Sequence, residues 1–139
     1  MNNTSREIDD AFEYCAKVTN AHYENFPVAS LFLPQEKRPY IQAIYAFART
    51  ADDFSDEGFF SSNERIEKLD DWQRKLDECF EDCATHPIFI ALRETTQRLQ
   101  LPKELFSDLI TAFKMDVTKT RFETFEELLF YYSVALLLH

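Results

Sequence analysis

Glycine is nearly absent from this chain, which has one glycine and five prolines among 139 residues. Tight β-turns need residues that tolerate positive φ angles, and glycine adopts these angles at the lowest steric cost. A protein assembled from many β-hairpins is therefore not expected. The scarcity of glycine predicts an all-α fold.

Positive charge is also scarce, since 15 Lys and Arg residues face 25 Asp and Glu residues, for a net charge of −10. Nucleic acids and anionic lipids are bound through clustered Lys and Arg. We therefore expect no nucleic-acid partner, and cations are the better-suited ligands.

No N-terminal stretch combines a basic segment, an apolar run and a small-residue cleavage site, so we expect a cytoplasmic protein.

Apolar side chains recur three or four positions apart along most of the chain, which is the period of one helical face. Two prolines, Pro87 and Pro102, suit the first turn of a helix. Ser61 and Glu64 have the spacing of a capping box, which marks a helix start. Together these signals predict six helices, which begin near Ser5, Pro34, Ser61, Pro87, Pro102 and Thr124.

The first helix is expected over residues 5–23, and the second is expected to end near Asp56.

Three cysteines are too few and too scattered for a disulfide framework, and Cys79 and Cys83 are predicted to be small core residues. The third helix is amphipathic. Its predicted inner face consists of Ile66, Leu69, Gln73, Leu76, Phe80 and Cys83.

The last segment, Leu128 to Leu138, is an apolar run broken only by Ser133. It is too short to span a bilayer, which takes about 20 residues. The chain then stops at His139 without a glycine cap or a polar turn, as if within a buried helix. We therefore expect residues 1–139 to be the N-terminal part of a single domain.

The segment from Tyr45 to Glu57 carries the most informative chemistry. At 100° per residue, its inner positions extend the apolar stripe of the second helix into charge. An ordinary solvated face would place acids opposite the apolar stripe, whereas here they continue it, and buried carboxylates need a cation or a positive side chain. The stripe consists of Ile41, Tyr45, Ala48, Arg49, Asp52 and Asp56.

Asp52 and Asp56 lie one turn apart and can share a divalent ion, because Mg²⁺ takes one or two carboxylates together with water and phosphate oxygens. Arg49 would then hold a phosphate. The alternative is an acidic helix end exposed to water and partly neutralised by Arg49, although the helix dipole disfavours acids there. A di-iron bundle would need Glu-x-x-His pairs, which the sequence lacks.

The segment 45–57 resembles the first aspartate-rich motif of the squalene/phytoene synthase family. Residues 22–26 are similar to the His-Ser-Lys-Ser/Thr-Phe segment that precedes it in that family, and residues 115–128 resemble the stretch after its middle helices. Within the family, residues 22–30 and 44–49 most resemble the bacterial hydroxysqualene synthase branch, called HpnC.

The resemblance implies an isoprenoid synthase-type helical bundle and a Mg²⁺-dependent enzyme that ionises farnesyl or presqualene diphosphate, releases diphosphate and forms hydroxysqualene. Peripheral association with a membrane would suit such a lipophilic product. The implied roles are metal binding for Asp52, Asp53 and Asp56, diphosphate binding for His22 and Arg49, and lining of the cation pocket for Tyr45 and Phe26.

Glu24 and Asn25 replace a lysine and a serine that would help to hold diphosphate; both changes fit the branch, and they leave His22 and Arg49 as the clear phosphate ligands. The second acidic motif is not found in these 139 residues, which leaves alternatives open. We therefore expect the 139 residues alone to be inactive. A non-catalytic helical assembly module, or a phytoene or dehydrosqualene synthase, would show the same helices. The role of Asp116 and the oligomeric state stay open.

Overall fold

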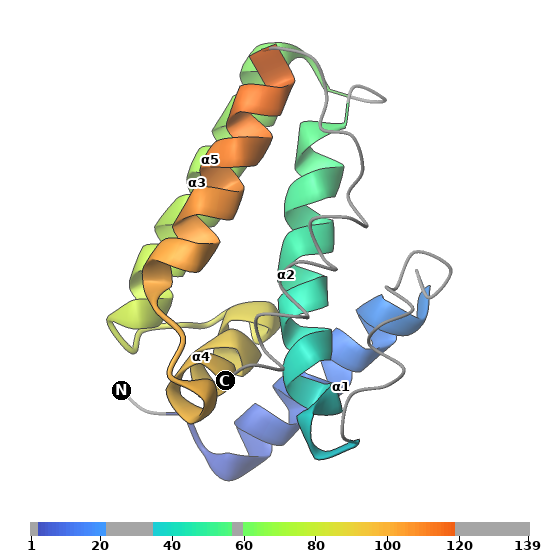
Figure 1. Ribbon diagram of the computed structural model, residues 1–139, viewed down its shortest axis with the longest axis vertical. Coiled ribbons are helices and arrows are strands. Elements are labelled where there is room, and N and C mark those ends of the chain that lie inside the picture. The colour runs from blue at the N-terminus through green and yellow to red at the C-terminus, as the bar shows by residue number, and fades with distance from the viewer. Residues whose placement is uncertain (1–2, 22–34, 57–59, 119–139) are drawn as a thin grey trace.

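The computed structural model describes residues 3–21, 35–56 and 60–118, and every regular element in these ranges is a helix (Figure 1). The all-α prediction is confirmed for this part of the chain, and the predicted sixth helix near Thr124 lies outside it. The elements are α1 (Ser5–Ala21), the 3₁₀ turn η3 (Gln35–Lys37), α2 (Arg38–Ser55), α3 (Ser62–Phe80), α4 (Pro87–Leu99) and α5 (Lys103–Thr118).

Side-chain caps start α3 and α4 at the predicted positions. The Ser61 hydroxyl accepts the backbone N–H of Glu64 at 3.2 Å, which is the N-cap bond of the predicted capping box, and it donates to the Glu64 carboxylate at 3.0 Å. Pro87 occupies the first turn of α4, as expected. The residue before it, His86, accepts the N–H of Ile88 on Nδ1 at 3.1 Å, a cap that the sequence did not indicate.

A left-handed residue, Asp82 (φ 60°), follows the end of α3 in place of the glycine that such positions usually hold. The N–H of Cys83 then bonds to the carbonyl of Glu78 at 2.9 Å. This turn carries Cys83 away from the inner face of α3 and leaves it exposed, so its prediction as a core residue was wrong. The same prediction is confirmed for Cys79, whose burial raises the pKa of its thiol to about 12.

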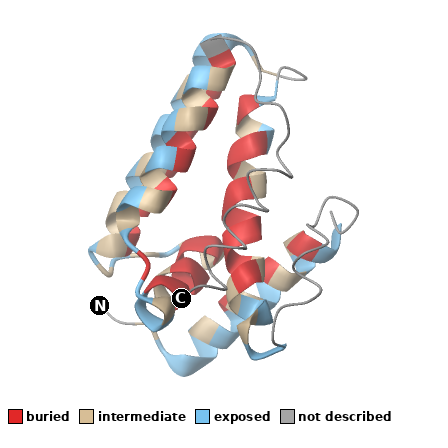
Figure 2. Ribbon diagram, viewed as in Figure 1, coloured by how far each residue is buried: buried red, intermediate tan, exposed pale blue. Residues whose placement is uncertain are grey.

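Helix α2 is the centre of the bundle and contacts each of the other four helices (Figures 1 and 2). Alanines at 43, 46, 48 and 51 have no exposed surface, so neighbouring backbones can approach closely. Between them, the Phe47 ring lies 5.4 Å from Phe106 and 5.8 Å from Phe89, both edge-on. This packing fixes the rotation of α2 and thereby the direction of every residue on its inner stripe.

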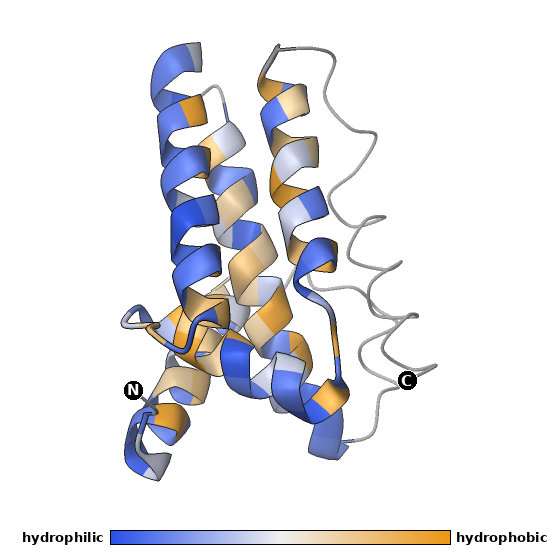
Figure 3. Cartoon of the chain, turned by 90° about the vertical axis from the view of Figure 1, so that its left-hand side faces the viewer, coloured by the Kyte–Doolittle hydropathy of each residue, from blue (hydrophilic) through white to orange (hydrophobic). Residues whose placement is uncertain are grey.

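The buried face of α3 lies one position away from much of the predicted face. It consists of Arg65, Leu69, Trp72, Leu76 and Cys79. Gln73, which was predicted to be internal, is half-buried and bonds to Asp77 on α3 and Ser107 on α5. The outer side of α3 is largely hydrophilic, whereas α5 shows hydrophobic and hydrophilic residues in alternation (Figure 3). Ion pairs such as Lys103 to Asp77 at 2.7 Å join the two helices.

The described residues include no helix that is long and apolar enough to cross a membrane.

Candidate functional site

The aspartate-rich segment forms the last two turns of α2. The inner stripe predicted from the sequence is confirmed as far as Asp52: Ile41, Tyr45 and Ala48 are buried, and Asp52 is only 6% exposed. A carboxylate therefore continues the apolar core of the bundle, as the spacing indicated. An ionised group at such a position is expensive unless charge and hydrogen bonds compensate it.

Asp56 does not share this environment, and the prediction that it also points inward was wrong. Helix α2 ends at Ser55, and Asp56 is its C-cap residue with extended backbone angles (φ −71°, ψ 135°). The chain leaves the helical path one residue before the predicted stripe is complete, so Asp56 is exposed. As the C-cap residue, Asp56 still lies at the same end of α2 as Asp52 and Asp53.

Arg49 lies beside two of the three acids. Its Nη2 is 3.2 Å from an oxygen of Asp53, and its Nη1 is 3.9 Å from an oxygen of Asp52. The Arg49 side chain is 20% exposed and that of Asp53 is 49% exposed, so this cluster spans the boundary between core and solvent. The structure thus contains the neutralisation by Arg49 that the alternative interpretation expected, with the closer contact to the exposed Asp53 and a longer one to the largely buried Asp52.

The last turn of α2 is closed by side chains that the sequence analysis did not select. The Ser55 hydroxyl donates to the carbonyl of Asp52 at 2.7 Å, and Arg65 of α3 donates through Nη1 to the carbonyl of Ser55 at 2.9 Å. Arg65 is itself 7% exposed. The available signal was its spacing, because Arg65 precedes Leu69 and Trp72 by four and seven positions, which places a charge on an otherwise apolar stripe.

The donors in this turn suit a hard divalent cation. Mg²⁺ prefers oxygen ligands and completes its shell with waters or substrate phosphates when the protein supplies one or two carboxylates. Asp52 offers a buried carboxylate, and Asp53 and Asp56 offer exposed ones. Within the described ranges, no group of three or more His, Cys, Asp or Glu side chains is placed to hold a metal ion.

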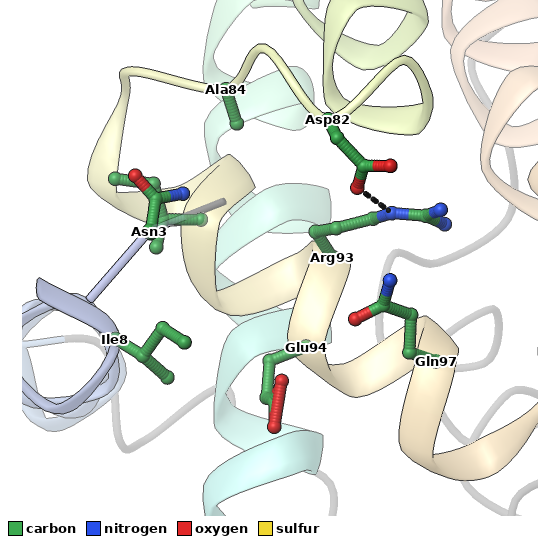
Figure 4. A pocket seen from close by; sticks show the side chains of 8 residues that line it. Asn3, Ile8, Asp82, Ala84, Arg93, Glu94 and Gln97 are labelled. Atoms are coloured by element: carbon green, nitrogen blue, oxygen red, sulfur yellow. Dashed lines mark hydrogen bonds and ion pairs between the residues drawn. The ribbon is translucent and has the colours of Figure 1, made fainter. Parts of the chain in front are cut away.

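Two surface pockets lie along α1 and α4, and none of the predicted site residues lines them. The first, of about 240 Å³, includes Asp82, Arg93 and Gln97 (Figure 4). There Arg93 donates to Asp82 at 2.8 Å, which lowers the pKa of that carboxyl. The second includes Pro39 and Tyr40, from the first turn of α2, at the opposite end of this helix from Asp52.

Two predicted substrate-binding residues, His22 and Phe26, lie outside the described part of the chain. Of the remaining predicted site residues, Tyr45 is 1% exposed and lies one turn before Arg49 on α2. The structure therefore places Tyr45, Arg49 and Asp52 on successive turns of the same helix. Asp116, on α5, is half-buried.

Comparisons with known proteins cover nearly the whole chain. A sequence profile of the family described as Squalene/phytoene synthase matches residues 7–137. A phytoene synthase of Arthrospira platensis is 34% identical over 127 residues, and a hydroxysqualene synthase of Rhodopseudomonas palustris is 39% identical over 108 residues. These matches cover 91% and 78% of this chain, but 41% and 36% of the two relatives.

The helices also match a solved structure, the crystal structure of squalene synthase HpnC from Alicyclobacillus acidocaldarius. The TM-score is 0.74 at 39% sequence identity, and the match covers 88% of this chain and 46% of that one. The predicted isoprenoid synthase-type helical fold is thereby confirmed. The chain spans about two fifths of the length of the curated relatives named above.

Proposed function

Because this chain belongs to the squalene/phytoene synthase family, we propose that it supplies the first acidic motif of a magnesium-dependent enzyme that ionises a prenyl diphosphate and releases diphosphate. The observation that supports this most strongly is the placement of Asp52. Its carboxylate is buried on the stripe that elsewhere forms the core, beside a guanidinium. A helix that served only as a scaffold would gain nothing from a buried acid on that stripe.

In this proposal Asp52 and Asp56 bind the metal, Asp53 supports them, and Arg49 binds diphosphate. Bound Mg²⁺ would neutralise the charge of the leaving diphosphate. Arg49 lies against Asp53 as an ion pair. A guanidinium fork matches phosphate oxygens as well as carboxylate oxygens, so Arg49 would exchange this ion pair for contacts with the diphosphate of an incoming substrate.

Tyr45 would shield the carbocation left behind. Its side chain is buried one turn before Arg49 on α2. The face of an aromatic ring stabilises a cation, and the ring also excludes water from it. His22 and Phe26 are proposed as a diphosphate ligand and a second pocket residue on the family resemblance alone. A lipophilic product would favour peripheral association of the enzyme with a membrane.

The specific reaction that we propose is the conversion of presqualene diphosphate to hydroxysqualene. Similarity at 39% identity to a hydroxysqualene synthase and to the HpnC structure supports it. A second candidate is a phytoene synthase-type condensation of two prenyl diphosphates. It is favoured by relatives named phytoene synthase that are 34% identical and align with 91% and 92% of this chain.

Product analysis separates these candidates. The 139-residue chain and the full-length protein encoded by its gene are each incubated with Mg²⁺ and either farnesyl or presqualene diphosphate. The products are identified by mass spectrometry. We expect the full-length protein to form an alcohol from presqualene diphosphate. A hydrocarbon product would favour the second candidate, and a full-length protein that releases no diphosphate from either substrate would favour a non-catalytic assembly module.

The 139 residues alone are expected to release no diphosphate. One cluster of carboxylates beside Arg49 can bind Mg²⁺ weakly, but it cannot hold two reacting groups within the roughly 3 to 3.5 Å that attack requires. Equal turnover by the 139-residue chain and the full-length protein would show that the active site has been misplaced.

A further inference from the structure

Arg65 is a buried cation that links its own helix to α2. It stands in the first turn of α3 and is 7% exposed. Its Nη2 bonds to the hydroxyl of Ser62 at 3.1 Å, whereas its Nη1 reaches across to α2 and donates to the carbonyl of Ser55 at 2.9 Å. A charge is retained at such a buried position only when its partners compensate for lost hydration.

The partner on α2 is the negative end of a helix. The last four carbonyls of a helix have no intrahelical partner and carry partial negative charge. In α2, the Asp52 carbonyl accepts from the Ser55 hydroxyl, the Asp53 carbonyl from the N–H of Asp56, and the Ser55 carbonyl from Arg65. Three carbonyls of this turn thus have partners, and only Arg65 comes from another helix.

The same turn carries the acids of the proposed metal site. Carboxylates at a helix C-terminus are destabilised by the dipole, so the backbone there would tend to fray. Apolar packing from α3 holds one side of the turn, where Phe54 lies edge-on to Trp72 with ring centroids 5.4 Å apart. Arg65 adds a charged hydrogen bond to the backbone between Asp52 and Asp56.

We propose that Arg65 is a positioning residue for the aspartate-rich end of α2. By capping the Ser55 carbonyl it fixes the last turn, and this keeps the backbone that carries Asp52 and Asp56 in place for binding of a divalent cation. The inference rests on the proposed function for the identity of the ligand. Arg65 acts through the backbone of α2, in contrast to Arg49, which lies against the carboxylates themselves.

The test measures metal binding and local order in the full-length protein. Mn²⁺ is the probe, because it takes the same oxygen ligands as Mg²⁺ and its free-ion EPR signal reports binding. Amide hydrogen exchange over residues 52–56 reports the order of the turn. The variants are Arg65→Met and Arg65→Lys. The matched control is Arg93→Met, since Arg93 also joins two elements by one charged hydrogen bond, to Asp82.

We expect Arg65→Met to weaken Mn²⁺ binding by about 10- to 100-fold, the usual effect of removing a group that orients metal ligands. Exchange over residues 52–56 should accelerate in the same variant. Arg65→Lys keeps the charge and one donor, so it should recover part of both losses. Arg93→Met should leave both readouts within about twofold of wild type, since it acts on no group near the turn.

Asp52→Asn distinguishes failure of this inference from failure of the proposed function. Loss of Mn²⁺ binding in Asp52→Asn with unchanged binding and exchange in Arg65→Met would overturn the role of Arg65 and leave the proposed function standing. Unchanged binding in Asp52→Asn would overturn both. Should Arg65→Met fail to fold, Arg65→Lys and Arg93→Lys are compared instead. A greater loss of Mn²⁺ affinity in Arg65→Lys than in Arg93→Lys supports the inference, and equal Mn²⁺ affinities of these two variants overturn it.

Discussion

The two halves of α2 share one inward stripe but use it differently. Up to Ala48 the stripe is apolar, and it anchors α2 among the four other helices. From Arg49 onward the same stripe carries an arginine and a buried aspartate. The first half stabilises the fold, whereas the second half places charge where burial is costly, and natural proteins tolerate such local conflicts chiefly at functional sites. The difference distinguishes residues that pack the core from the residues for which we propose a chemical role.

The largest effect on stability is expected in the middle of α2. Phe47 has no exposed surface and touches rings from three other helices, so Phe47→Ala should lower the free energy of unfolding by about 3 to 5 kcal/mol. Urea unfolding followed by circular dichroism measures this. Met115→Ala, at a residue that is 48% exposed, is the control and should change stability by less than about 0.5 kcal/mol. Similar losses in both variants would show that α2 is not the centre of the core.

A smaller, pH-dependent effect is expected at His86, far from the charged half of α2 in sequence. Burial, reinforced by the positive charge of Lys75, lowers the pKa of His86 below its ordinary value. The unfolded chain therefore binds this proton more readily, and stability rises with pH. The contribution is complete above about pH 6.5, the pKa of an unperturbed histidine, and is lost as the pH falls from there through the lowered pKa.

Protonation would also remove the acceptor that caps Ile88. His86→Asn keeps a good capping residue without titrating. The wild-type protein should lose about 1 kcal/mol more than this variant between pH 7 and pH 5, a loss comparable to that of a helix cap. Parallel stability curves for the two proteins over this range would contradict the assignment.

The smallest effect is expected on the outer surface, where Lys103 donates to Asp77 and lowers the pKa of that carboxyl. Both side chains are well exposed, so solvent screens the pair, and Asp77→Asn should cost less than about 1 kcal/mol. The cost should vanish near 1 M salt, where the Debye length is only about 3 Å. A loss as large as that of Phe47→Ala would mean that surface charge, and not the α2 core, holds α3 and α5 together.

Local signals in the sequence predicted most of the described fold. The helix starts at Ser61 and Pro87 were predictable because caps and first-turn prolines act within a few residues. The inner face of α3 was misplaced because Trp72 and Gln73 are neighbours, and only tertiary packing decides which of them turns inward. Cys83 was misassigned because the helix ends in a left-handed aspartate, a position that sequence patterns associate with glycine.

At the site, periodicity predicted the burial of Asp52 correctly because the helix continues through it. It failed at Asp56 because α2 stops one residue earlier, and helix ends are set by capping bonds rather than by the apolar period. One of those bonds comes from Arg65, on another helix. A contact of this kind depends on how two helices pack, and no local pattern encodes it.

The central claim is that the charged half of α2 serves chemistry and not packing. The direct measurement is turnover of prenyl diphosphate by full-length wild-type and Asp52→Asn proteins over a Mg²⁺ series, with helical content followed by circular dichroism. Because Asn keeps the volume of Asp but removes its charge, we expect turnover to fall by at least about 100-fold while helical content stays unchanged. Undiminished turnover of Asp52→Asn at saturating Mg²⁺ would contradict the claim.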